Sequence, residues 1–90
     1  MLPCCVYILY SETDHQLYTG FTTNLARRLE QHHEGEVRST APRRPLKLIF
    51  CEYYISREDA LRREKYFKTT QGKRALKIML RHTLNKASLS

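Results

Sequence analysis

Short runs of hydrophobic residues along the chain have the length and composition of β-strands. Residues 4–10 (CCVYILY) are β-branched and aromatic and are bounded by Pro3 and Ser11, so they predict a strand. Residues 16–21 predict a second strand, and the short turn-rich connection makes the pair an antiparallel hairpin. Residues 46–54 (LKLIFCEYY) are apolar on both alternating faces, as expected of a strand that is covered on each side.

Helical spacing follows the hairpin. Asn24 is the expected N-cap of a short helix in which Leu25, Leu29 and His32 share one face, and Gly35 is expected to end it. The polar residues 36–45, which include two prolines, are expected to form a loop.

Two more helices are predicted after the third strand. Ser56 starts one over residues 57–70, Gln71 and Gly72 break it, and a last helix covers residues 73–84. That helix carries an apolar stripe of Leu76, Met79, Leu80 and Leu84. The order β-β-α-β-α-α predicts an α+β fold, with a small, mainly antiparallel three-stranded sheet flanked by helices.

Length and composition limit the classes of protein that fit. Ninety residues with 41% hydrophobic composition suit one folded domain, expected over residues 1–84, and residues 85–90 are expected to be a frayed tail. No apolar run is long enough to span a bilayer and no signal peptide is evident, so we expect a cytoplasmic protein that does not enter a membrane. The cysteines Cys4, Cys5 and Cys51 have no metal-binding spacing and are interpreted as reduced, largely buried residues.

Charge is distributed unevenly along the chain. The net charge is +7, and no acidic residue follows Glu64. Such asymmetry favours a polyanionic partner, most often nucleic acid. A solvated basic tail that only improves solubility is the alternative interpretation.

Several sequence fragments together form a recognisable pattern. Tyr7 precedes the fragment YTGFTTNLARRLEQH, which begins at Tyr18 and contains Gly20 and Arg28. The fragments RRPLKLIFCE and RREKYFK come later in the chain. In this order and spacing, the fragments resemble the GIY-YIG nuclease superfamily, particularly its small stand-alone bacterial members, from about residue 6 to residue 80. The resemblance implies the GIY-YIG endonuclease fold. The tyrosines and the last glycine of the two signatures are kept, whereas Cys5 and Thr19 depart from them.

The resemblance implies a role for each of five residues. Tyr18 would be the general base, Tyr7 its hydrogen-bonded neighbour, and Arg28 the clamp on the phosphate. Glu64 would be the single ligand of one Mg²⁺ or Mn²⁺ ion, which suits a hard carboxylate oxygen. His32 lies four residues after Arg28, so both side chains can point into the same site.

Each of these residues also has a simpler explanation. Tyrosines on strands commonly pack in the core, a single histidine is usually structural, and Glu64 can pair with Lys68 at i+4. Arg27, next to Arg28, is a competing choice for the clamp, and the spacing from Tyr18 selects Arg28. The joint spacing of the residues, rather than any one of them, favours a catalytic site.

Basic residues elsewhere are candidate contacts to a nucleic-acid backbone. They show no evident base-reading pattern, so binding is expected to be salt-sensitive and weakly sequence-specific. The candidates are Arg38, Arg43, Arg44, Lys47, Lys65, Lys68, Lys73 and Arg74. Thr40 and Arg44, in the loop before the third strand, are also candidates for holding a phosphate near the metal ion.

Three functions remain open at this point. The first is a metal-dependent endonuclease acting on structured or damaged DNA, since relatives serve DNA repair, recombination and mobile elements. The second is a nucleic-acid-binding module of the same fold that no longer cleaves. The third is an interaction protein that dimerises through the apolar stripe of the last helix. Because core packing also explains that stripe, we expect a monomer. The sequence does not identify a partner protein that would direct this protein to its substrate.

Overall fold

Strand β1 (Cys4–Ser11) is the centre of the fold, and all eight of its residues are buried. In the computed structural model, which describes the backbone of residues 2–89 and the side chains of residues 2–87, it lies between the other two strands. These are β2 (Leu17–Thr22) and β3 (Leu46–Tyr54), and both run antiparallel to β1 in the order β2-β1-β3. Both β2 and β3 are therefore edge strands.

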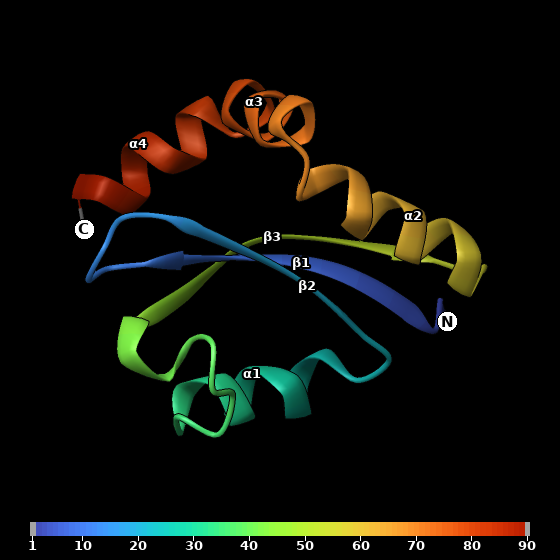
Figure 1. The fold of residues 1–90 in the computed structure, drawn as a ribbon, viewed down its shortest axis with the longest axis horizontal. Helices are drawn as coiled ribbons and strands as arrows, with labels where there is room; N and C mark the ends of the chain where they lie inside the picture. Colours follow the sequence, from blue (N-terminus) through green and yellow to red (C-terminus); the bar gives the residue numbers. More distant parts are fainter. Residues whose placement is uncertain (1, 90) are drawn as a thin grey trace.

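Helices cover both faces of the sheet (Figure 1). One face carries α1 (Leu25–His33), and a 3₁₀ turn, η1 (Ala41–Arg43), leads from it into β3. The other face carries α2 (Arg57–Phe67), α3 (Thr70–Met79) and α4 (Arg81–Leu89). The expected α+β class with a three-stranded antiparallel sheet is confirmed.

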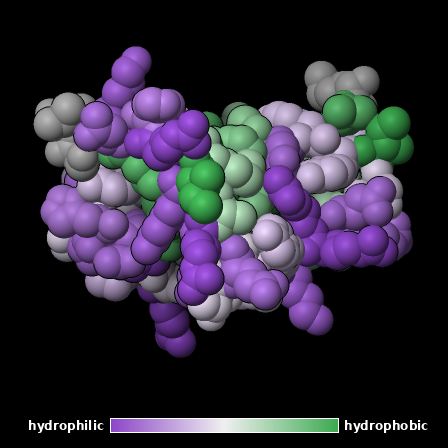
Figure 2. Space-filling model, turned by 90° about the horizontal axis from the view of Figure 1, so that it is seen from above, coloured by the Kyte–Doolittle hydropathy of each residue, from purple (hydrophilic) through white to green (hydrophobic). Residues whose placement is uncertain are grey.

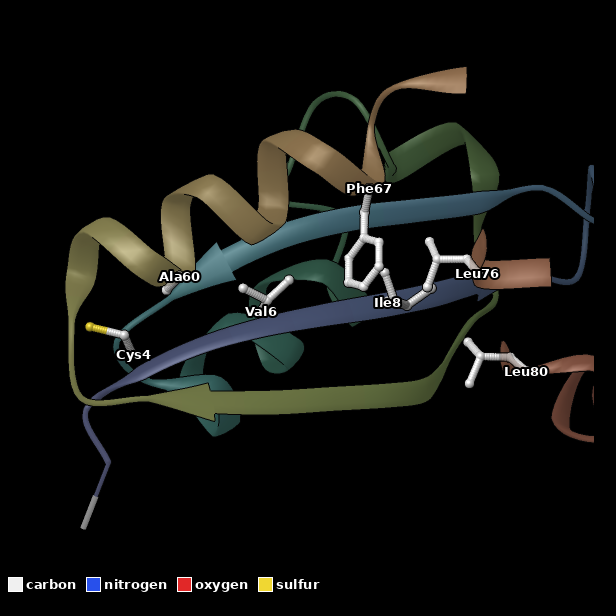
Figure 3. Packing of buried hydrophobic residues seen from close by; sticks show 7 residues of the cluster. All are labelled: Cys4, Val6, Ile8, Ala60, Phe67, Leu76 and Leu80. Atoms are coloured by element: carbon white, nitrogen blue, oxygen red, sulfur yellow. The ribbon is translucent and has the colours of Figure 1, made fainter. Parts of the chain in front are cut away.

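The alternation of side chains along β1 supplies a core to each face. Val6 and Ile8 pack with Phe67 and Leu76 on the side of α2 and α3 (Figure 3). Cys5, Tyr7 and Leu9 belong to the second cluster, toward α1. In that second cluster, Tyr7 brings its hydroxyl group into the core, where the hydroxyl requires hydrogen-bond partners.

The junctions between the C-terminal helices differ from the predicted ones. The predicted break at Gln71 and Gly72 is wrong: α2 ends at Phe67, and Thr69 caps α3 by accepting a hydrogen bond from the backbone N–H of Gly72 at 3.0 Å. Gly72 is buried within α3, where a Cβ would lie 1.8 Å from the carbonyl oxygen of Tyr66. Its role is close packing of two helices rather than helix termination.

The predicted last helix over residues 73–84 is two helices, α3 and α4, joined at Leu80. Helix α4 continues through the expected frayed segment to Leu89, and Ala87 within it is buried, whereas Ser90 lies outside the described residues. In the apolar stripe, Leu76 and Leu80 are core residues, but Met79 is 46% exposed.

The three cysteines differ in their exposure. Cys4 and Cys5 are buried as expected, whereas Cys51 is exposed on the edge strand β3, and all three are free thiols. Among the described residues, no helix is both long and apolar enough to cross a membrane.

Candidate active site

Tyr7 is the anchor of the candidate site because its ring crosses from β1 over β2. Tyr7 pairs with Gly20, where a Cβ would lie 2.3 Å from the Cζ atom of the tyrosine. Only a glycine leaves room for the ring at this point, which explains the close approach that the sequence suggested at Gly20. Tyr18, two residues before Gly20, faces the same side of the sheet, with its ring centroid 6.4 Å from that of Tyr7.

Helix α1 contributes Arg28 and His32 to the same place. The hydroxyl of Tyr7 lies 2.7 Å from Nε2 of His32, and Nε of Arg28 donates to that hydroxyl at 3.4 Å. The imidazole also packs edge-on against Tyr18, with centroids 5.2 Å apart. The four residues predicted as catalytic therefore come together. Tyr7 was expected to be the hydrogen-bonded neighbour of Tyr18. In the described residues its hydroxyl instead forms hydrogen bonds with His32 and Arg28.

A chain of hydrogen bonds continues from Tyr7 into the core. Nδ1 of His32 lies 2.7 Å from Oγ1 of Thr40, which donates in turn to the carbonyl oxygen of Val37 at 3.4 Å. A guanidinium can only donate and a carbonyl can only accept, so the two ends fix the direction of the chain. Arg28 donates to Tyr7, Tyr7 to Nε2 of His32, and Nδ1–H of His32 to Thr40. His32 is thus assigned as the neutral Nδ1–H tautomer.

The electrostatics of the site agree with this assignment. Burial, followed by the nearby charge of Arg28, lowers the pKa of His32 from 6.5 to about 4. Burial also raises the pKa of Tyr7 from 10.0 to about 12, although the hydrogen bond from Arg28 acts in the opposite direction. Both groups are therefore neutral near pH 7. Fully buried Tyr7 is unsuited to act as a base, whereas Tyr18 is only partly buried.

Arg28 is held in place from two sides. Besides the bond to Tyr7, its Nη1 donates to Oε1 of Gln31 at 3.0 Å. The hydrogen bond to Tyr7 is the main cause that raises the pKa of Arg28, with a smaller hydrogen-bond contribution from Tyr18. Arg27 is exposed instead. The geometry therefore favours Arg28 over Arg27 as the clamp. The sequence analysis missed Gln31, although its i+3 spacing from Arg28 was a usable signal.

Glu64 approaches from α2, on the other face of the sheet. Its side chain is 20% exposed and accepts a hydrogen bond from Nζ of Lys68 at 3.1 Å, so the expected i+4 pair is present. Its charge is near enough to contribute to the raised pKa of Tyr7. The candidate metal ligand is therefore close enough to interact electrostatically with Tyr7 across the sheet.

Glu64 is compatible with a metal ion that takes a single ligand from the protein. The described residues contain no group of three or more His, Cys, Asp or Glu side chains that could hold a metal ion. Mg²⁺ commonly keeps several waters and binds through one or two carboxylates plus substrate phosphate. A single, partly exposed carboxylate is compatible with that coordination.

Several of the predicted nucleic-acid contacts are engaged within the protein. Arg43 pairs with Asp14 at 2.7 Å, Lys47 lies 3.5 Å from Glu12, and Arg44 donates to two backbone carbonyl groups. Arg38, Lys65 and Arg74 are exposed. Lys68 and Lys73 line the same hollow as Tyr18, so they are the predicted contacts that lie beside the site.

The expected phosphate contact at Thr40 is wrong. Thr40 is fully buried, and its hydroxyl bonds His32 and the carbonyl of Val37. Its distance from His32 along the sequence gave no signal of this contact, because the loop between α1 and β3 brings the two residues together.

Comparison with known proteins agrees with this fold. The family model described as the GIY-YIG catalytic domain matches residues 3–77. A UPF0213 protein of Staphylococcus haemolyticus is 39% identical over 75 residues, covering 82% of this chain and 90% of that protein. A UPF0213 protein of Limosilactobacillus reuteri is 39% identical over 80 residues, covering 86% and 82%.

A solved structure shows the same relationship. The solution NMR structure of a UPF0213 protein from Bacillus halodurans is 33% identical, covers 84% of this chain and 83% of its own, and has a TM-score of 0.55. The chain therefore belongs to the GIY-YIG family, a nuclease-type family. It is similar throughout its matched length to the small bacterial UPF0213 proteins.

Proposed function

We propose that this protein is a metal-dependent endonuclease that hydrolyses phosphodiester bonds in structured or damaged DNA. The observation that carries the proposal is the convergence of Tyr7, Tyr18, Arg28 and His32 beside β2, within the electrostatic reach of Glu64. Family membership supports a nucleic-acid substrate. A net charge of +7 supports a polyanion.

Tyr18 is the proposed base. As the phenolate, it takes a proton from a water molecule while the water oxygen attacks phosphorus, and the bond from phosphorus to the leaving oxygen breaks. Arg28 is the proposed clamp, because a guanidinium fork suits a non-bridging phosphate oxygen. The leaving oxygen is protonated from solvent.

The remaining residues hold this arrangement. Tyr7 orients Arg28 by accepting from its Nε, and His32 fixes the hydroxyl of Tyr7. Glu64 would hold one Mg²⁺ or Mn²⁺ ion, which when bound neutralises developing charge on the phosphate oxygens. Removal of divalent cations with a chelator should therefore abolish cleavage.

A cleavage screen tests the proposal. Flaps, forks, junctions, nicked duplexes, single strands and RNA are incubated with Mg²⁺ or Mn²⁺, and products are resolved on denaturing gels. Wild type should cut at least one DNA structure, whereas Tyr18→Phe and Glu64→Gln, confirmed as folded by circular dichroism, should not. Cleavage that survives in both variants would show a contaminating nuclease and would remove the support for this site.

One observation favours a second function, a nucleic-acid-binding module that does not cleave. Lys68 occupies Oε2 of Glu64 and so competes with a metal ion for the carboxylate. Salt-sensitive binding without cleavage of any substrate, with either metal, would establish this second function in place of the first.

A further inference from the structure

Two basic hollows lie along the edge strand β2. The first, here called the lysine hollow, has a volume of about 420 Å³ and is lined at the start of β2 by Tyr18 and by Lys68, Lys73 and Lys77 of the helical side. The second, the arginine hollow, has a volume of about 360 Å³. It is lined at the end of β2 by residues 21–24 and by Arg27, Arg28, Gln31 and Arg57.

The candidate active site lies between the two hollows. Tyr18 lines the lysine hollow, whereas Arg28 lines the arginine hollow. Helix α2 connects them, with Arg57 at its first residue and Lys68 just beyond its last. At 1.5 Å per residue these two positions are roughly 16 Å apart along the helix. Glu64 lies on the same helix between them.

Several cations of these hollows are available for an external anion. In the described part of the chain, Arg57, Lys73 and Lys77 are exposed and have no carboxylate partner within 4.0 Å. Arg57 stacks on the ring of Phe21 at 5.0 Å, which leaves the edge of its guanidinium free to bind. Figure 2 shows the face covered by α2, α3 and α4, where hydrophilic side chains surround a smaller apolar patch.

The opposite edge of the sheet differs. Near β3, Arg63 pairs with Glu52 at 2.6 Å, and Asp59 lines a third hollow together with Arg62 and Arg63. Positive charge is therefore offset by carboxylates at the β3 edge, whereas among the described cations that line the two β2 hollows only Lys68 has a carboxylate partner, Glu64. A polyanion is favoured at β2.

We propose that a single polynucleotide strand lies along the β2 edge and occupies both hollows, one on each side of the bond that is cleaved. This inference rests on the proposed function and adds Arg27, Arg57 and Lys77 as substrate-binding residues. Proteins that hold single strands combine a positive groove with aromatic side chains. Here Tyr18 lines one hollow and Phe21 lines the other.

The test is equilibrium binding of a fluorescent single-stranded oligonucleotide, without divalent cations so that no strand is cut. Arg57→Ala and Lys77→Ala each remove one exposed cation from one hollow, and Arg62→Ala and Lys86→Ala are matched exposed controls elsewhere. Each hollow variant should raise Kd several-fold and lower the slope of log affinity against log salt by about 0.7. Arg57→Lys should keep most of the slope, and the controls should match wild type.

The outcomes separate this proposal from the proposed function. If wild type binds or cuts a strand but all four alanine variants behave alike, the path along β2 is wrong while the function stands. If only one hollow matters, or if a fully paired duplex binds tighter with the same dependence on Arg57 and Lys77, the two-sided single-strand path is also overturned. If wild type neither binds nor cuts any nucleic acid, the proposed function itself fails.

In the cleavage assay, the hollow variants should raise KM and leave kcat unchanged. Arg57 and Lys77 contact the strand away from the reacting phosphate in this arrangement, so they contribute equally to ground-state and transition-state binding. A loss of kcat with unchanged KM in either variant would place that residue at the reacting phosphate and contradict the proposed path.

Discussion

His32 and Thr40, both fully buried, are joined by a contact of 2.7 Å between Nδ1 and Oγ1. This contact connects helix α1 to the loop that precedes β3. Because Nε2 of the same imidazole bonds the hydroxyl of Tyr7, the loop indirectly sets the orientation of the tyrosine at the candidate site. Thr40 is therefore a positioning residue that contacts no substrate in the proposed arrangement.

Replacing Thr40 should weaken both the fold and the site. Thr40→Val keeps the shape but leaves Nδ1–H of His32 without an acceptor, which costs about 1 to 3 kcal/mol for a buried donor. Urea unfolding should show this loss, and kcat should fall because Tyr7 and Arg28 are less firmly oriented. Thr40→Ser, which retains the hydroxyl, should restore both quantities. Equal behaviour of the valine and serine variants would contradict the role of the hydroxyl.

Gly20→Ala should displace the ring of Tyr7. The new Cβ would lie 2.3 Å from Cζ of Tyr7, whose ring is fully buried and has little room to move. Overpacking of this kind costs about 1 to 3 kcal/mol, and a displacement of about 1 Å in a catalytic group can reduce activity by about 100-fold. Urea unfolding and the cleavage assay measure the two effects.

A double-mutant cycle supplies the control for this clash. In a Tyr7→Ala background, Gly20→Ala should cost much less stability, because the clashing ring is gone. An unchanged cost in that background would show that the alanine acts on the backbone of β2 rather than through Tyr7.

Much of the fold and of the candidate site could be predicted because the signals were local. Short runs of apolar, β-branched and aromatic residues identified the strands. Asn24 and Ser56 act as N-caps as expected, each accepting from the backbone N–H three residues later. Sequence spacing also selected Arg28 over Arg27, in agreement with the contact between Arg28 and Tyr7.

The features that were missed depend on contacts between distant segments. Gly72 looked like a helix breaker, yet its missing side chain permits contact with Tyr66. Thr40 looked like a loop residue that could hold a phosphate, yet it is fully buried and bonded to His32. The two hollows beside β2 require the packing of α1, α2 and α3 around one edge, which no single stretch of sequence encodes.

Arg27 and Arg28 should have separable roles. Arg28→Lys keeps the charge but loses the fork that bonds both Tyr7 and Gln31, so kcat should fall by at least tenfold. Arg27→Ala should mainly raise KM, since Arg27 is exposed in the arginine hollow. Steady-state cleavage kinetics distinguish the two effects. An Arg28→Ala protein that still cleaves while Arg27→Ala does not would reverse the assignment.

Lys68 should weaken metal binding at Glu64. Lys68→Met removes the ammonium group from Oε2 of the carboxylate, and an exposed pair of this kind contributes about 0.2 to 1 kcal/mol. The Kd for Mn²⁺, measured by calorimetry without nucleic acid, should therefore fall by up to about fivefold. Lys65→Met, on the same helix, is the control for general charge. An equal change of Kd in both variants would indicate an effect of the overall positive charge rather than of the Lys68–Glu64 pair. Glu64→Gln should abolish Mn²⁺ binding.

Stability should depend on pH through His32. Its pKa is lowered from 6.5 to about 4 on folding, so between these values the unfolded chain binds the extra proton and the folded protein does not. The free energy of unfolding should therefore rise with pH from about 4 to 6.5, with a contribution from this residue of at most about 1.4 kcal/mol per pH unit. Above 6.5 the contribution is constant, since both states are neutral.

Urea unfolding across pH 4 to 7 measures this dependence, and the slope rather than the absolute stability is the quantity compared. His32→Gln should flatten the slope even if it lowers stability at every pH, because the titrating group is gone. His33→Gln, at the exposed neighbouring histidine, is the matched control and should retain the wild-type slope. A slope that survives in His32→Gln would assign the pH dependence to other groups and would contradict a neutral, buried imidazole between Tyr7 and Thr40.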